Sequence, residues 1–146
     1  MFGRTLTLLV MAALAGCAGK ASDESSSNTS ADGPSPTELA AYAGAARYPS
    51  EMKSKELRAH AVVDRENGII KIYNLGNQNL RDVRVWVNKS FVKRIDGIAP
   101  QSSVTIRTDE LYDGLGRTFA SQDEEVAIVQ LQTLDELYDL MGPTAK

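Results

Sequence analysis

Apolar and polar residues alternate through much of the chain between residues 58 and 131, and this alternation most restricts the fold. The segment Arg81–Asn88 shows it clearly, because Val83, Val85 and Val87 share one face of an extended chain. A period of two residues is typical of strands that are buried on one side. The sequence therefore predicts a mainly β domain.

Turn signals separate the candidate strands. The pair Asn67-Gly68, which lies between two apolar runs, favours a tight hairpin turn. Short strands at intervals of about ten residues suggest a small antiparallel sandwich. The pattern from Arg81 to Ile106 is similar to that of immunoglobulin and fibronectin-III modules, which implies the same sandwich. The expected strands are Ala59–Asp64, Ile69–Asn74, Arg81–Asn88, Phe91–Ile95, Ser103–Arg107 and Val126–Leu131.

The end of the domain carries a helical pattern. The segment Thr133-Leu-Asp-Glu136 fits a capping box. Three of the residues that follow, Leu137, Tyr138 and Met141, then fall on one helical face together with Leu134. We therefore expect a short C-terminal helix that covers one open end or edge of the sandwich.

A change in composition separates this domain from the N-terminus. Residues 20–36 contain no aromatic residue and no aliphatic residue larger than alanine. Such a segment buries too little apolar surface to offset the entropy of ordering, so we expect a disordered tether. The next segment, Thr37–Tyr48, fits either a short helix capped by Thr37 or a continuation of the linker. We assign residues 17–50 to the tether and 51–146 to the domain.

A short apolar segment precedes the single cysteine of the chain. Arg4 supplies a positive charge, and the run that ends at Leu14 is shorter than the roughly 20 residues that span a bilayer. These features are typical of a secretory signal peptide. The residues Leu14-Ala15-Gly16-Cys17 resemble the lipobox of bacterial lipoproteins, and the resemblance covers the leader and Cys17.

This resemblance implies a covalent membrane anchor. In that family the thiol of Cys17 receives a diacylglyceryl group, residues 1–16 are removed, and the new amino group is acylated. Two or more acyl chains hold a protein firmly on a membrane. Ala18 stands where an aspartate favours inner-membrane retention in Gram-negative lipoproteins. We therefore expect a lipid-anchored envelope protein at the outer membrane, facing the periplasm.

Charge and residue usage argue against several functions. The leader's single charged residue is Arg4, so the mature chain has 19 acidic against 15 basic residues, which disfavours nucleic acid as a partner. His60, the only histidine, has no cysteine or carboxylate partners at zinc spacing. We find no nucleophile elbow and no phosphate-binding glycine loop. We predict no catalytic residue, no metal and no cofactor.

Two acidic clusters and one basic hairpin are the remaining candidates for a site. The clusters, which are Asp109, Glu110 and Asp113 and then Asp123–Glu125, do not match a calcium-binding EF-hand loop, and we interpret them as solvated loop charge.

The basic hairpin is the candidate partner-binding site. Its residues could form a mixed aromatic and cationic patch for an acidic protein or an anionic glycan. Alternatively, Trp86 packs against a second layer of the fold and the cations form a solvated edge. The candidate residues are Arg84, Trp86, Lys89, Lys93 and Arg94.

These observations lead to three functional hypotheses. The first is an envelope lipoprotein that presents a small non-catalytic β domain to a protein or cell-wall partner. The second is an assembly or chaperone factor that pairs an edge strand with a client. The third is a small envelope hydrolase that uses the loop carboxylates.

Overall fold

The computed structural model describes the backbone of residues 33–145 and the side chains of residues 33–140. All of these residues belong to one compact unit. The helical elements are α1 (Pro36–Ala45) and the short 3-10 helices η1 (Thr108–Glu110) and η2 (Phe119–Ser121). The strands are β1 (Ser54–Asp64), β2 (Ile69–Asn74), β3 (Leu80–Val87), β4 (Phe91–Ile98), β5 (Ser102–Arg107), β6 (Val129–Gln132) and β7 (Leu137–Ala145).

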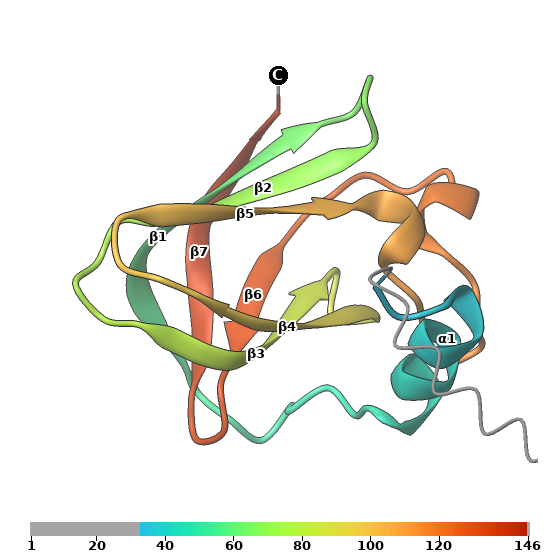
Figure 1. Cartoon of the computed structure of the whole chain (residues 1–146), viewed down its shortest axis with the longest axis horizontal. Helices are drawn as coiled ribbons and strands as arrows, with labels where there is room; N and C mark the ends of the chain where they lie inside the picture. The colour runs from blue at the N-terminus through green and yellow to red at the C-terminus, as the bar shows by residue number, and fades with distance from the viewer. Residues whose placement is uncertain (1–32, 146) are drawn as a thin grey trace, which may run out of the picture. The chain divides into compact units, whose positions relative to one another are not determined.

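The seven strands form one mixed sheet in the order β4-β3-β6-β7-β1-β2-β5. Only β1 and β7 pair in parallel, and every other neighbouring pair among the described strands is antiparallel. The sheet curls into a nearly closed, barrel-like form (Figure 1). A mainly β domain is thus confirmed. The expected two-sheet immunoglobulin-like sandwich is not confirmed, because all the described strands hydrogen-bond into a single sheet.

The predicted C-terminal helix is wrong, because residues 137–145 form strand β7. The segment Thr133–Glu136 is a turn rather than a capping box: the N–H of Thr133 donates to the carbonyl of Glu136 at 2.9 Å, and Gln132 pairs with Leu137. Tyr138 and Leu140 face the barrel core, whereas Leu134 is 84% exposed. Backbone hydrogen bonds to β6 and β1 therefore stabilise residues 137–145 as a strand, although their local sequence pattern favours a helix.

Turn chemistry sets the positions of the two clearest hairpins. Gly68 has a φ of +61°, which suits the tight turn after β1, and the expected strand Ile69–Asn74 is confirmed residue for residue. In the β3–β4 turn, Asn88 and Lys89 both have positive φ. The Asn88 side chain also accepts from the N–H groups of Ala127 and Ile128 and donates to the carbonyl of Glu125. Asn88 therefore holds the segment that leads into β6.

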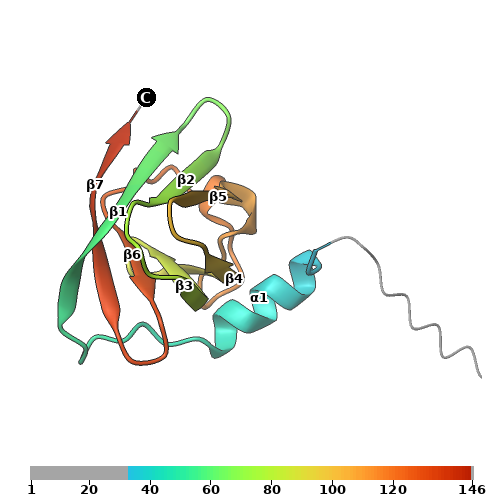
Figure 2. The ribbon, with the colours of Figure 1, turned by 60° about the vertical axis from the view of Figure 1, so that its left-hand side comes forward.

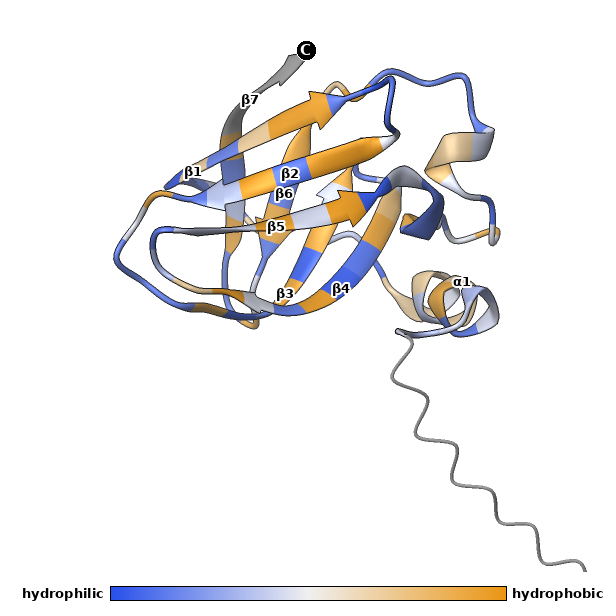
Figure 3. Cartoon of the chain, turned by 45° about the horizontal axis from the view of Figure 1, so that its top comes forward, coloured by the Kyte–Doolittle hydropathy of each residue, from blue (hydrophilic) through white to orange (hydrophobic). Residues whose placement is uncertain are grey.

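The core lies inside the curled sheet. The three valines of β3, whose shared face the sequence predicted, are fully buried in it, and the rings of Phe91 and Phe119 meet edge to face at 5.1 Å. Hydrophobic and hydrophilic residues alternate along the strands (Figure 3). The alternation that defined the strands therefore also separates the inner face of the sheet from its outer face.

Helix α1 begins at Pro36 and packs outside the barrel (Figure 2). Its N-cap is Ser35, not Thr37 as predicted: Ser35 and Glu38 form a reciprocal capping box. The helix contributes Ala43 to a second apolar cluster, in which it meets Trp86 and Val92 of the sheet. Of the two alternatives left open for this segment, the short helix is the one observed.

The side-chain hydrogen bonds of Asn88 lead to a prediction about stability. Asn88→Ala removes three hydrogen bonds to residues 125–128 and places alanine at a φ of +50°. We expect a loss of about 2 kcal/mol in the free energy of unfolding, measured by urea denaturation. The matched control is Asn77→Ala, at an exposed turn position, and it should lie within about 0.5 kcal/mol of wild type. Equal stability of the two variants would contradict a stabilising role for the Asn88 hydrogen bonds.

Candidate functional site

The predicted aromatic anchor of the basic hairpin is not on the surface. Trp86 is 3% exposed, and its indole N–H donates to Oε1 of Gln132 at 2.8 Å. The ring of Tyr48 lies edge-on to it with the centroids 5.4 Å apart. Trp86 therefore packs beneath the segment that follows α1.

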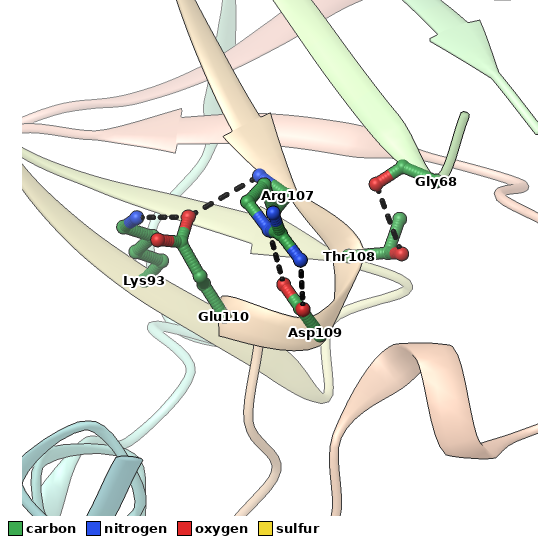
Figure 4. Close-up of polar contacts among 6 residues, drawn as sticks. All are labelled: Gly68, Lys93, Arg107, Thr108, Asp109 and Glu110. Atoms are coloured by element: carbon green, nitrogen blue, oxygen red, sulfur yellow. Dashed lines mark hydrogen bonds and ion pairs between the residues drawn. The ribbon is translucent and has the colours of Figure 1, made fainter. Parts of the chain in front are cut away.

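The cations of the hairpin do not form one patch. Lys93 lies on the same face of β4 as the core residues Phe91 and Ile95, and its ammonium contacts Glu110 at 2.5 Å (Figure 4). Arg94 lies on the opposite face of β4. It pairs directly across from Arg84 in the sheet register. Arg84, Trp86 and Arg94 thus share the outer face of the sheet, Lys93 faces the core side, and Lys89 lies in the turn between the two strands.

Two of these cations are held by neighbouring groups. The Nε of Arg94 donates to Asp82 at 2.6 Å, and this hydrogen bond raises the pKa of the Arg94 guanidinium. The ammonium of Lys89 lies 5.8 Å from the centroid of the Tyr48 ring, within the range of a cation–π contact. The structure gives these side chains local partners, so the hairpin offers less free positive charge than its sequence suggests.

A different feature, the boundary between β4 and β5, offers a better site. These strands are the two edges of the sheet and are not hydrogen-bonded to each other as a ladder. They are joined by a turn in which Ser102 N–H donates to Ala99 O, and they diverge from it (Figure 1). At the far end Val92 of β4 and Tyr112 exchange two backbone hydrogen bonds, of 2.8 and 3.4 Å. We call the unpaired stretch between these two closures the seam.

A pocket of about 600 Å³ lies at the seam, between α1 and strands β4 and β5. Leu39, Ile95 and Val104 supply apolar walls, and Lys93 and Arg94 also line it. Tyr42 of α1 completes the lining, and its hydroxyl oxygen is buried without a hydrogen-bond partner, the one such side-chain atom in the described part of the chain. Buried polar groups in proteins are nearly always bonded, so this hydroxyl marks the pocket as a candidate binding site.

The residues of the first acidic cluster form hydrogen bonds and ion pairs within the domain. Asp109 forms a two-point contact with Arg107, and this hydrogen bonding lowers the pKa of the Asp109 carboxyl (Figure 4). Glu110 accepts from Lys93 and from the N–H of Arg107. Asp113, which was expected to be solvated, is 4% exposed. That expectation is wrong because Asp113 holds its own loop together.

The Asp113 carboxylate organises the loop through Arg117. Oδ1 accepts from the backbone N–H groups of Leu115 and Arg117, each at 2.9 Å, and Oδ2 accepts from the Arg117 guanidinium. Burial by itself raises the pKa of Asp113, but these hydrogen bonds and the charge of Arg117 outweigh it. The pKa of Asp113 therefore lies below its ordinary value, and the carboxylate is charged at neutral pH.

The second acidic cluster lies in the loop between η2 and β6. Asp123 and Glu124 are exposed, and Glu125 pairs with Arg65 at 2.8 Å, which lowers the pKa of Glu125. No group of histidine, cysteine and carboxylate side chains among the described residues has the geometry to hold a metal ion. The carboxylates of the two clusters do not converge on one point in the described structure.

The other predicted site residues are His60 and Cys17. His60 is half-buried in β1 and lies opposite Tyr73 of β2. Cys17, the predicted lipidation site, lies outside the described residues. Within residues 33–145 no helix has the length and apolarity to cross a bilayer.

Comparisons with known proteins add no assignment. No protein-family model matches the chain, and searches of curated proteins and of solved structures found no match either. The candidate site therefore depends on the geometry alone. Sequence reasoning missed Tyr42 as a site residue, because the strand pattern did not indicate that α1 would cover the seam.

The buried carboxylate of Asp113 predicts a pH dependence of stability. Because its folded-state pKa is lowered, its contribution is complete above the unfolded-state pKa of about 3.9 and is lost as the pH falls through the folded-state pKa. Asp113→Asn should lower the free energy of unfolding at pH 7 by about 1–3 kcal/mol and shrink the acid-induced loss. Denaturation at pH 7 and below pH 4 measures both. Asp123→Asn, at an exposed position, is the control, and a profile for Asp113→Asn that overlays it would refute the assignment.

Proposed function

We propose that this chain is a lipid-anchored lipoprotein of the cell envelope whose β domain binds a protein or cell-wall partner without catalysing a reaction. The proposal of a lipid anchor depends on the motif Leu14-Ala15-Gly16-Cys17, which follows a short apolar segment. The acyl chains on Cys17 attach the protein to the membrane, at the outer membrane facing the periplasm. The segment between Cys17 and the Ser35 cap of α1 is the spacer between anchor and domain.

The spacer gives the domain reach. A coil of the length of residues 18–34 has an end-to-end distance of roughly 20–25 Å. This distance is enough to lift a small domain clear of the lipid headgroups. The mature chain carries more acidic than basic residues, so the acyl anchor rather than surface charge provides the attachment.

The seam pocket supports a binding role for the domain. A pocket of about 600 Å³ is within the usual range of ligand sites, and it combines apolar walls with the unpartnered hydroxyl of Tyr42. A group supplied by a partner satisfies this hydroxyl and fills the space between Leu39 and Val104. The proposed function is therefore to present this surface to a partner within reach of the membrane.

A second candidate function is an assembly or chaperone factor that pairs an edge strand with a client. The observation that favours it is the absence of a ladder between β4 and β5, the two edges of the described sheet. Unpaired edge strands offer backbone donors and acceptors to another chain. The available stretch is short, because the bridge between Val92 and Tyr112 closes one end of the seam.

The anchor is tested by metabolic labelling. Cells that express the full chain with an alkyne fatty acid in the medium should incorporate the label into wild type and not into Cys17→Ala. Ala18→Ser keeps the cysteine and the small-residue context, and it should label like wild type. Equal labelling of wild type and Cys17→Ala would refute the anchor.

The membrane assignment has its own test. Ala18→Asp should retain the fatty-acid label and move the protein from the outer-membrane to the inner-membrane fraction on a sucrose gradient. An unchanged distribution of Ala18→Asp, with the label intact, would contradict sorting by the residue after the cysteine.

A further inference from the structure

The Tyr42 hydroxyl is the starting point for identifying what the seam pocket binds. The residue belongs to α1, whose position is set by the Ser35–Glu38 capping box and by Ala43 in the second apolar cluster. Its hydroxyl oxygen is buried and makes no hydrogen bond to any of the described residues. A hydroxyl group can donate one hydrogen bond and accept others, so a ligand at this position needs a matching polar atom.

The edge of β4 supplies further polar groups. The backbone N–H and C=O of Val92 point away from β3, because they bond Tyr112. Alternation along a strand places the N–H and C=O of Arg94 on the same outer edge. No ladder covers that edge between Arg94 and β5 in the described sheet. An added extended chain can therefore pair with Arg94 through its own backbone.

The charges at the pocket favour a neutral ligand. Lys93 is neutralised by Glu110 at 2.5 Å, and Arg94 by Asp82 at 2.6 Å. Asp96 adds a further negative charge that acts on Arg94. An anionic ligand thus finds its potential cationic partners already engaged.

Glu38, the other acidic residue of the lining, has hydrogen-bond partners of its own. The carboxylate of Glu38 accepts from the backbone N–H and the hydroxyl of Ser35, and these bonds lower the pKa of Glu38. A cationic ligand therefore gains little from it. A neutral chain of alternating donors and acceptors with an apolar side chain complements the pocket better than an ion does.

We infer that the seam pocket binds a short extended peptide segment of a protein partner, an inference that rests on the proposed binding role of the domain. The peptide backbone pairs with Arg94 on the edge of β4. One apolar side chain enters between Leu39, Ile95 and Val104. A peptide carbonyl accepts a hydrogen bond from Tyr42. Backbone pairing supplies affinity in this arrangement, and the side-chain pocket supplies selectivity.

Selection from a random heptapeptide library displayed on phage, against the purified full chain in detergent, tests the inference. We expect the selected peptides to share an apolar residue and to lack net charge. Tyr42→Phe should weaken their binding about five- to tenfold, which is the effect of one lost hydrogen bond. Val104→Trp, which fills the pocket, should abolish binding. Isothermal calorimetry measures both effects.

Controls separate the pocket from folding and from the anchor. Tyr42→Phe should unfold at the same temperature as wild type or higher, because the hydroxyl makes no hydrogen bond in the described structure. Leu115→Ser changes an 80% exposed residue outside the pocket and should leave binding unchanged. If Val104→Trp fails to fold, amide shifts of the wild type on peptide addition decide instead, and they should be confined to residues 39–42, 93–97 and 103–105, which surround the pocket.

Three outcomes overturn the inference. They are the failure to select any peptide, peptide binding that is equal in wild type, Tyr42→Phe and Val104→Trp, and amide shifts outside the seam. Each is distinguishable from failure of the proposed anchor, because fatty-acid labelling of Cys17 does not depend on the pocket. If the chain incorporates the fatty-acid label but binds no peptide, the proposed anchor is supported and the proposed peptide site is contradicted.

Discussion

The rest of the sheet depends on the backbone pairing of β7. This strand is antiparallel to β6 on one side and parallel to β1 on the other. Without it, the remaining strands would form two separate three-stranded groups, β4-β3-β6 and β1-β2-β5. The register of β7 on β1 shifts between His60 and Val62, around Gly142 and Pro143. A proline is tolerated at such an irregularity, where the ladder is already interrupted.

Joining the two groups through β7 also creates the candidate site. Once the sheet curls as a single layer, its edges β4 and β5 meet only at their hairpin and at the bridge from Val92 to Tyr112. The Lys93–Glu110 ion pair lies next to that bridge, and α1 covers part of the opening. The pocket is therefore a consequence of incomplete closure. Its lining includes Tyr42, whose hydroxyl has no partner among the described residues, and Arg94 on the unpaired edge of β4, which together suit the binding of another chain.

The basic hairpin shows why composition alone is a poor guide to a binding surface. Its cations occur close together in the sequence, yet alternate residues of a strand point to opposite faces. Lys93 consequently faces the core side, and Arg94 the outer side, where the segment after α1 already covers Trp86. Tyr42, by contrast, comes from a helix that is distant in the chain, and no local pattern links it to β4. The anchor at Cys17 is a separate matter, since it is a local motif and remains a proposal from sequence.

The sequence by itself determined the local elements: the strands with period-two burial, the Asn67-Gly68 hairpin and a mainly β domain. These follow from side-chain alternation and turn chemistry, which act between near neighbours. Only the tertiary structure decided the state of residues 133–145, because their helical pattern competes with backbone pairing to two strands distant in the chain. The predictions of a C-terminal helix and of a two-sheet sandwich therefore differ from the structure for the same reason. The strand that joins the two groups of strands is recognisable only from the partners it pairs with.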